Sequence, residues 1–108
     1  MEMKELLEFI HKVNEHFMKV DADMDIEKHT LLRSMKLAEE VGELYEQILT
    51  HYGHGRKEKL EKYSPENLEH EMADVLFAAL MIAKSLNIDV EKAMTNKMKT
   101  IKNRLEIE

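Results

Sequence analysis

Residues 36–44, KLAEEVGEL, and residues 71–75, EMADV, are the two stretches of this 108-residue chain that indicate its fold and its functional site. Each stretch is rich in helix-forming residues and carries two carboxylates three positions apart. These are the pairs Glu40 and Glu43, and Glu71 and Asp74. Residues i and i+3 lie on the same side of an α-helix, so two facing helices would gather four carboxylates at one place. Such a group repels itself strongly unless a cation lies among its members. The sequence therefore predicts a cation site between two helices.

The composition indicates a single helical domain. A chain of 108 residues forms one domain with a modest core. Its hydrophobic content of 44% is typical of globular proteins. Only 3 Gly and 1 Pro interrupt it, and runs rich in β-branched and aromatic residues are few. We therefore predict an all-α fold.

The charge and the residue types exclude several classes of protein. The formal net charge is −6, whereas a nucleic-acid-binding domain normally carries a basic face, so no nucleic acid partner is predicted. The absence of cysteine excludes disulfides and thiolate metal sites. No apolar run approaches the ~18 residues that a membrane-spanning helix needs, and the N-terminal residues lack a signal-peptide pattern. A cytoplasmic protein without a membrane partner is expected.

Apolar residues recur at helical spacing along four segments. The predicted helices span residues 3–20, 27–51, 65–86 and 89–105, with a basic loop or short helical insert at 52–64. The segment 65–86 becomes apolar on nearly every side in its second half, and a helix of that kind is buried all round. A subunit of this size cannot bury it alone. We therefore expect a four-helix bundle-like subunit that assembles as a homodimer or homotetramer.

Two residues interrupt the apolar stripes of the first two helices. Asn14 lies among apolar residues and needs a polar partner there; the alternatives are a hydrogen bond between helices and a contact with a bound ligand. Gly42 lies inside the second helix, where glycine costs about 1 kcal/mol relative to alanine. The expectation is that another backbone approaches Gly42 closely.

The last helix carries cations on its apolar side. At about 100° per residue, Lys97 projects into the middle of the apolar stripe and Arg104 onto its edge. Either the two side chains reach past the apolar surface to water and to a carboxylate, or they face the two acidic helices. The second alternative predicts cations opposite the carboxylate cluster.

The ligand atoms indicate the kind of ion. Ligands that are all carboxylate oxygens favour a hard divalent cation such as Mg²⁺, with Mn²⁺ as the alternative. Glu39 is turned about 100° from Glu40 around the helix, and it is a candidate for holding a second ion or for activating a water molecule. Lys36, one turn before Glu40 on the same side, is a candidate for contacting phosphate oxygens.

The two acidic stretches together resemble a known family. EExxE at residues 39–43 followed by ExxD at 71–74 is similar to the signature of the MazG-type, all-α nucleoside triphosphate pyrophosphohydrolases. Residues 87–93, NIDVEKA, resemble the link into the last helix of that family, and the C-terminal helix has a similar K…NR ending. The resemblance runs from about residue 28 to residue 104.

The resemblance implies a Mg²⁺-dependent enzyme that cleaves a (d)NTP to (d)NMP and pyrophosphate, with nucleotide-pool house-cleaning as its role. The implied metal ligands are Glu40, Glu43, Glu71 and Asp74, and the implied catalytic carboxylate is Glu39. The implied substrate-binding residues are Lys97 and Arg104, then Lys99 and Asn103, to which Lys36 and Asn14 are added from their positions on the helices. The chain has no tryptophan, and the base that it selects is not predicted.

Three other interpretations remain open. A dUTPase-like enzyme or a phosphoribosyl-ATP pyrophosphohydrolase belongs to the same superfamily. A carboxylate-bridged di-iron bundle needs Glu-x-x-His on two helices, whereas the chain has one such pair, Glu8 and His11. A non-catalytic helical interaction module would leave the acidic residues solvated, and its melting would not respond to Mg²⁺.

Overall fold

The computed structural model describes all residues 1–108, and it contains helices and links without any strand. Its helices are α1 (Met3–Val20), α2 (Ile26–His51), α3 (Lys57–Glu61), α4 (Pro65–Ser85) and α5 (Val90–Leu105). The all-α prediction is confirmed, and the four long helices end within one residue of their predicted ends. The segment 52–64 is a helical insert, since it contains α3.

Side-chain caps explain where three of the helices begin. The caps are Asp25 for α2, Ser64 for α4 and Asp89 for α5, and each accepts a hydrogen bond from the backbone N–H three residues later. These bonds satisfy N–H groups that have no acceptor within the helix. α4 also has Pro65 at its first position, where the missing N–H costs nothing.

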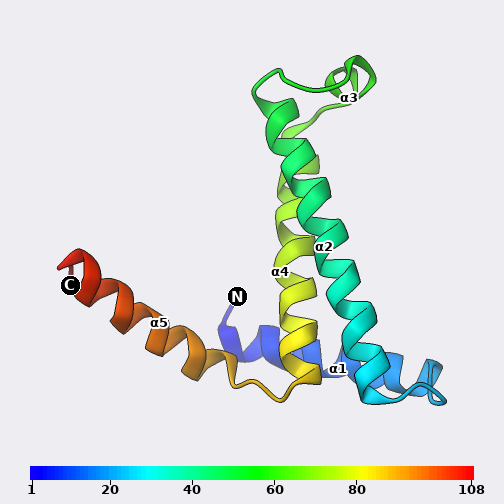
Figure 1. The fold of residues 1–108 in the computed structure, drawn as a ribbon, viewed down its shortest axis with the longest axis vertical. Helices are drawn as coiled ribbons and strands as arrows, with labels where there is room; N and C mark the ends of the chain where they lie inside the picture. The colour runs from blue at the N-terminus through cyan, green and yellow to red at the C-terminus, as the bar shows by residue number, and fades with distance from the viewer.

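The centre of the molecule is a long hairpin of α2 and α4 (Figure 1). α1 crosses the end of this hairpin where α2 begins and α4 ends, and α3 lies at the opposite end. The Phe9 ring of α1 meets the Phe77 ring of α4 edge to face, with centroids 6.1 Å apart. The hairpin therefore brings the two acidic stretches side by side, and α1 covers one of its ends.

One half-buried arginine of α2 forms hydrogen bonds with both α1 and α4. Arg33 Nη1 of α2 lies 2.9 Å from Asn14 Oδ1 of α1, and 3.2 Å from the Met81 carbonyl and 2.6 Å from Ser85 Oγ of α4. Asn14 thus makes the hydrogen bond between helices that was one of its two predicted alternatives. A contact of Asn14 with a ligand stays a prediction.

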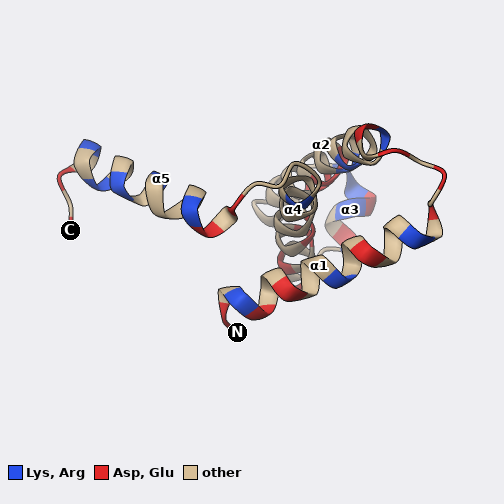
Figure 2. Ribbon diagram, turned by 90° about the horizontal axis from the view of Figure 1, so that it is seen from below, with Lys and Arg blue, Asp and Glu red and all other residues tan.

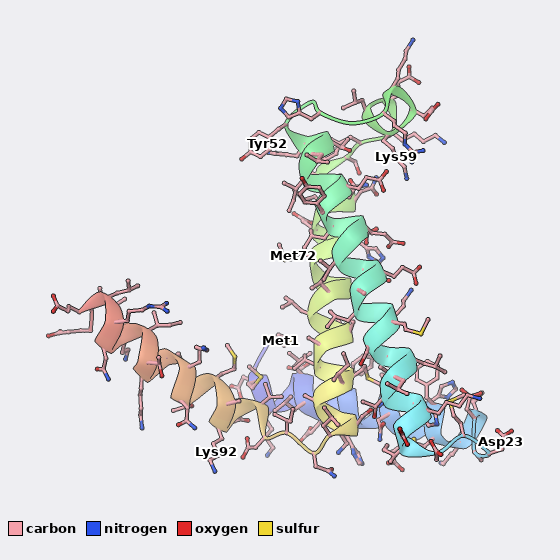
Figure 3. The ribbon with its side chains drawn as sticks, viewed as in Figure 1. Met1, Asp23, Tyr52, Lys59, Met72 and Lys92 are labelled. Atoms are coloured by element: carbon pink, nitrogen blue, oxygen red, sulfur yellow. The ribbon has the colours of Figure 1, made fainter.

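α5 does not pack along the hairpin. Figure 1 shows it projecting sideways from the link after α4, and Figure 3 shows its side chains extending on all sides. Met94 and Met98 of its apolar stripe are consequently more than half exposed. The expectation that Lys97 and Arg104 face the acidic helices is therefore not met within one chain. The reason is that the link, with Asn87 at a φ of 54°, directs α5 away from the hairpin.

Very little apolar surface is buried within the chain. Ile10 and Ala83 are its only buried apolar residues. No close backbone approach accompanies Gly42: a Cβ there would meet no atom within 4 Å, because Gly42 lies about 200° around α2 from Glu40, which faces α4. The structure has no helix with the length and apolar character that crossing a membrane requires.

Candidate active site

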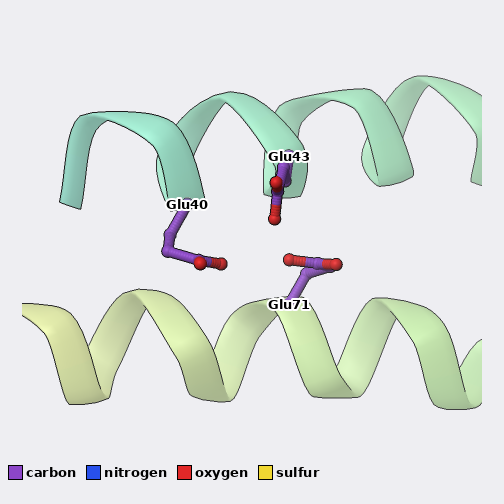
Figure 4. Close-up of side chains that lie close together, drawn as sticks. All are labelled: Glu40, Glu43 and Glu71. Carbon is purple, nitrogen blue, oxygen red and sulfur yellow. The ribbon is translucent and has the colours of Figure 1, made fainter. Parts of the chain in front are cut away.

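Three glutamates from α2 and α4 meet in the middle of the hairpin. Glu40 and Glu43 extend from α2 and Glu71 from α4, and their carboxylates converge in the space between the two helices (Figure 4). One carboxylate oxygen of each lies within 4.8 Å of the other two. The spacing of three along α2 places its two carboxylates on one side, and the pairing of the helices supplies the third. We call these three residues the carboxylate cluster.

The burial of the cluster requires a partner of opposite charge. Glu40 is buried, and Glu43 and Glu71 are half-buried. Glu40 Oε2 and Glu71 Oε2 are both buried without a hydrogen-bond partner. A buried charged group without a partner costs several kcal/mol, so native structures seldom keep one. Oxygen-only ligands with unsatisfied buried atoms fit a hard divalent cation, for which Glu40, Glu43 and Glu71 would be the ligands.

The nearest cation in the chain is the ammonium of Lys36. Lys36 Nζ lies 2.8 Å from Glu40 Oε1, one turn along α2. This hydrogen bond is the main reason that the pKa of Glu40 lies below its ordinary value, in opposition to the effect of burial. The same bond, followed by the charge of Glu39, raises the pKa of Lys36.

Glu71 has the opposite electrostatic environment. Burial, and then the charges of Glu43 and Glu40, raise the pKa of the Glu71 carboxyl above its ordinary value. The Lys36 ammonium is bonded to Glu40 and makes no ion pair with Glu71. The pKa values of two carboxyls in the cluster are therefore shifted in opposite directions, downward for Glu40 and upward for Glu71.

These shifts predict how metal-free stability depends on pH. The folded protein holds a proton on Glu71 at a higher pH than the unfolded chain does, so lowering the pH toward the ordinary glutamate pKa of 4.5 should stabilise the fold. Below that pKa, protonation of Glu40 removes the Lys36 interaction and stability should fall. Urea unfolding at a series of pH values checks this. In a Glu71→Gln variant the gain above pH 4.5 should disappear, and a gain that persisted would assign it to another group.

The other predicted carboxylates lie beside the cluster and not in it. Asp74 Oδ2 is 3.3 Å from His70 Nε2, and Asp74 is half-buried and lines the cavity described below. Its charge also contributes to the raised pKa of Glu71, after burial and the two other glutamates. Glu39 is exposed on the outer side of α2. A metal-ligand role for Asp74 and a catalytic role for Glu39 stay predictions.

A cavity of about 450 Å³ adjoins the cluster. It lies among α1, α2, the link between them and α4. Its walls include the apolar side chains of Val13, Phe17, Met24, Leu32, Phe77 and Met81. Lys36, Glu40 and Asp74 line it as well, so the cavity and the carboxylate cluster share Glu40. A volume of this size accommodates a small-molecule ligand.

Two polar side chains in this cavity were not singled out from the sequence. His29 is 4% exposed, and its Nε2 has no hydrogen-bond partner. Arg33 Nη2 is also buried without a hydrogen-bond partner. Both residues line the cavity. A signal for them existed, because positions 29, 33, 36 and 40 follow the i, i+4, i+7, i+11 spacing of one helix side. Their burial, which depends on α1 and α4, was not readable from that spacing.

The predicted cations of α5 lie away from the cluster in a single chain. Lys97, Lys99, Asn103 and Arg104 are all exposed, and Figure 2 shows the Lys and Arg positions spaced along α5 beyond the hairpin. Of the predicted phosphate-binding cations, the structure places Lys36 alone beside the carboxylates. The contribution of the α5 residues stays a prediction.

Comparison with known proteins identifies the family of the chain. Residues 26–106 match the model of the MazG nucleotide pyrophosphohydrolase domain. The chain is also similar to the uncharacterized protein YpjD of Bacillus subtilis (strain 168), with 38% identity over 58 residues. That alignment covers 54% of this chain and 50% of YpjD, so the chain spans about half the length of this relative. No solved structure matches the chain. The family match extends over α2 to α5 and includes all three glutamates of the cluster, and the chain therefore belongs to the MazG nucleotide pyrophosphohydrolase domain family.

Proposed function

We propose that the protein is a Mg²⁺-dependent nucleoside triphosphate pyrophosphohydrolase that converts a (d)NTP to (d)NMP and pyrophosphate, in nucleotide-pool house-cleaning. The observation that carries the proposal is the carboxylate cluster, which has two buried oxygens without partners and shares Glu40 with a ligand-sized cavity. Family membership supports the general reaction. The metal and the substrate are the finer points proposed here.

The cluster has the chemistry to hold the ion. Glu40, Glu43 and Glu71 would bind it through carboxylate oxygens, and Asp74, whose charge acts on Glu71, is the proposed fourth ligand. When bound, Mg²⁺ supplies positive charge to phosphate oxygens and lowers the pKa of a coordinated water molecule. Mn²⁺ suits the same oxygen ligands.

The remaining residues have roles set by their positions. Glu39, which is exposed and precedes Glu40 on α2, would accept the proton of the attacking water as the P–O bond to pyrophosphate breaks. Lys36 contacts the phosphates through its ammonium. The nucleoside enters the cavity, where the apolar walls cover its flat faces and His29 Nε2 and Arg33 Nη2 gain hydrogen-bond partners.

The reaction is tested by incubating the protein with a panel of NTPs and dNTPs plus Mg²⁺ and measuring pyrophosphate. The panel includes dUTP and phosphoribosyl-ATP, because the dUTPase-like and phosphoribosyl-ATP pyrophosphohydrolase alternatives predict strong preference for one of them. Release of orthophosphate in place of pyrophosphate, or no release from any substrate, would contradict the proposal.

We also propose that the protein works as a homodimer or homotetramer. One face of the hairpin is apolar and exposed, and it carries Val41, Tyr45, Met72 and Leu76. These residues lie about 100° to 140° around their helices from the nearest cluster glutamate, so the face points away from the metal site. A chain that buries two apolar residues has little core of its own, and a second copy on this face would supply one.

A charge placed on this face should therefore separate the subunits. Leu76 is 58% exposed within the chain, so Leu76→Glu causes no clash there but would bury a carboxylate between subunits. Light scattering after size exclusion should give a multiple of 12.7 kDa for the wild type and a smaller species for Leu76→Glu. Val20→Glu is the matched control, because Val20 is an exposed residue of α1 that lies outside this face. This variant should leave the assembly intact. A wild-type monomer at micromolar concentration would rule the assembly out.

A further inference from the structure

One ion pair in the structure ends on the carboxylate cluster, and it comes from Lys36. The other ion pairs join Glu46 to Arg56 and Lys59, and Asp74 to His70. Lys36 Nζ bonds to Glu40 Oε1 at 2.8 Å, while Glu40 Oε2 and Glu71 Oε2 remain without partners. One positive charge therefore faces three carboxylates, which leaves the cluster short of cationic charge.

Helix preference does not explain this pair. In an isolated helix, an acid four residues before a base is the more favourable order, and here the base precedes the acid. The Lys36 side chain is 58% exposed, whereas that of Glu40 is 6% exposed. The lysine thus has free access to water, and it bends toward the cluster because Glu40 has no other cation within reach.

We infer that Lys36 is an exchangeable counter-ion: its ammonium neutralises Glu40 until the divalent cation binds, and it then turns to the phosphates of the substrate. This inference rests on the proposed function, since it presumes the metal site. Lys36 and the ion would compete for the charge of the same carboxylate, because the ammonium holds Glu40 Oε1 while the unpartnered Oε2 faces the cluster. A divalent ion brings more charge to three carboxylates and accepts oxygens from all of them at once, so it has the advantage in that competition.

The displaced side chain has a second partner nearby. A lysine has a flexible four-carbon stem and three donors without an acceptor, so it can leave Glu40 without leaving the site. Lys36 and Glu40 both line the cavity, where the phosphates of a metal-bound nucleotide would lie next to the cluster. The freed ammonium would bind these oxygens. Lys36 then couples the two binding steps: it weakens binding of the metal ion alone and strengthens binding of the metal–nucleotide complex.

The inference predicts opposite effects of one substitution on two ligands. Lys36→Met keeps the unbranched stem and removes the charge. Calorimetric titration of MgCl₂ into the nucleotide-free variant should show tighter binding than in the wild type, by about fivefold. Titration with the Mg²⁺ complex of an α,β-methylene nucleoside triphosphate should show weaker binding than in the wild type, by at least the same factor.

Lys28→Met is the matched control, because it removes the same charge from the same helix. Lys28 is exposed and lies about 18 Å along α2 from Glu40, which exceeds the Debye length of about 8 Å at physiological salt. Both affinities should stay within twofold of the wild type. A direct readout is acetylation of the wild type by acetic anhydride: Mg²⁺ should increase modification of Lys36 and leave that of Lys28 unchanged.

The outcomes separate this inference from the proposed function. Lack of Mg²⁺ binding by the wild type would remove the metal site, and both proposals would fail together. If the wild type binds Mg²⁺ and Lys36→Met binds it no more tightly than Lys28→Met does, the exchange is wrong and the metal site stands. Tighter Mg²⁺ binding with unchanged affinity for the methylene analogue would refute the transfer of Lys36 to the phosphates.

Discussion

Replacing Glu71 with glutamine is expected to abolish pyrophosphate release and, at the same time, to stabilise the metal-free protein. The loss follows from removing a metal ligand, which costs several kcal/mol of transition-state stabilisation, or about a thousandfold in rate. The gain follows from the raised pKa of Glu71, since burial and the charges of Glu43 and Glu40 make its ionised form unfavourable in the fold. A glutamine keeps the shape and removes the repulsion.

The response to Mg²⁺ distinguishes this outcome from simple misfolding. For the wild type, Mg²⁺ at about a hundredfold above its Kd should add about 2.7 kcal/mol of stability. This corresponds to a rise in Tm on the order of 10 °C for a domain of this size. Glu71→Gln should start from a higher Tm and show almost no rise, and scanning calorimetry with and without Mg²⁺ measures both quantities.

Glu69→Gln is the control for this experiment, because Glu69 is exposed on α4 and lies about 160° from Glu71 around the helix. It loses the same charge and should retain the activity and the Mg²⁺ response of the wild type. Equal Tm shifts in the wild type and Glu71→Gln would remove Glu71 from the metal site. They would also favour the non-catalytic helical module.

The second large effect is expected in α5, where Lys97→Ala should reduce turnover about a hundredfold while Lys99→Ala changes it little. Lys97 projects from the same side of α5 as Met94 and Met98, which are exposed in the single chain. Covering that apolar stripe in the working assembly would carry Lys97 toward the acidic helices. Removing a cation from a transferring phosphoryl group costs about 10²-fold or more in rate. Lys99, about 200° around the helix from Lys97, would stay in solvent.

Steady-state kinetics of the two variants, with their masses in solution, tests this arrangement. Both proteins should keep the assembly of the wild type, since each loses one exposed lysine. A larger loss for Lys99→Ala than for Lys97→Ala would mean that the opposite side of α5 faces the site. Full activity in both would leave Lys36 as the phosphate-binding cation.

Much of the local structure was predictable from the sequence. The helices followed from apolar residues at helical spacing, because this signal acts between residues a few positions apart. The same holds for Glu40 and Glu43, whose spacing alone puts them on one side of α2. The family signature was readable for the same reason.

Two predictions that depended on packing between distant parts of the chain were not met within one chain. Gly42 has no neighbour within 4 Å, and α5 projects away from the acidic helices that it was expected to face. Helical periodicity gives the side of a helix that is apolar but not the surface that covers it. That surface lies on another element or on another subunit, and no pattern within one helix identifies it.

The sequence by itself determined an all-α chain of the MazG family with two acidic helix segments, because helix formation and residue spacing are local properties. Only the tertiary structure decided that three carboxylates meet within 4.8 Å with Asp74 beside them, that Lys36 is the one cation paired with the cluster, through Glu40, and that His29 and Arg33 line an adjoining cavity. These features arise where α1, α2 and α4 pack together. The burial that shifts the pKa of Glu71 and leaves carboxylate oxygens without partners exists only in the folded chain.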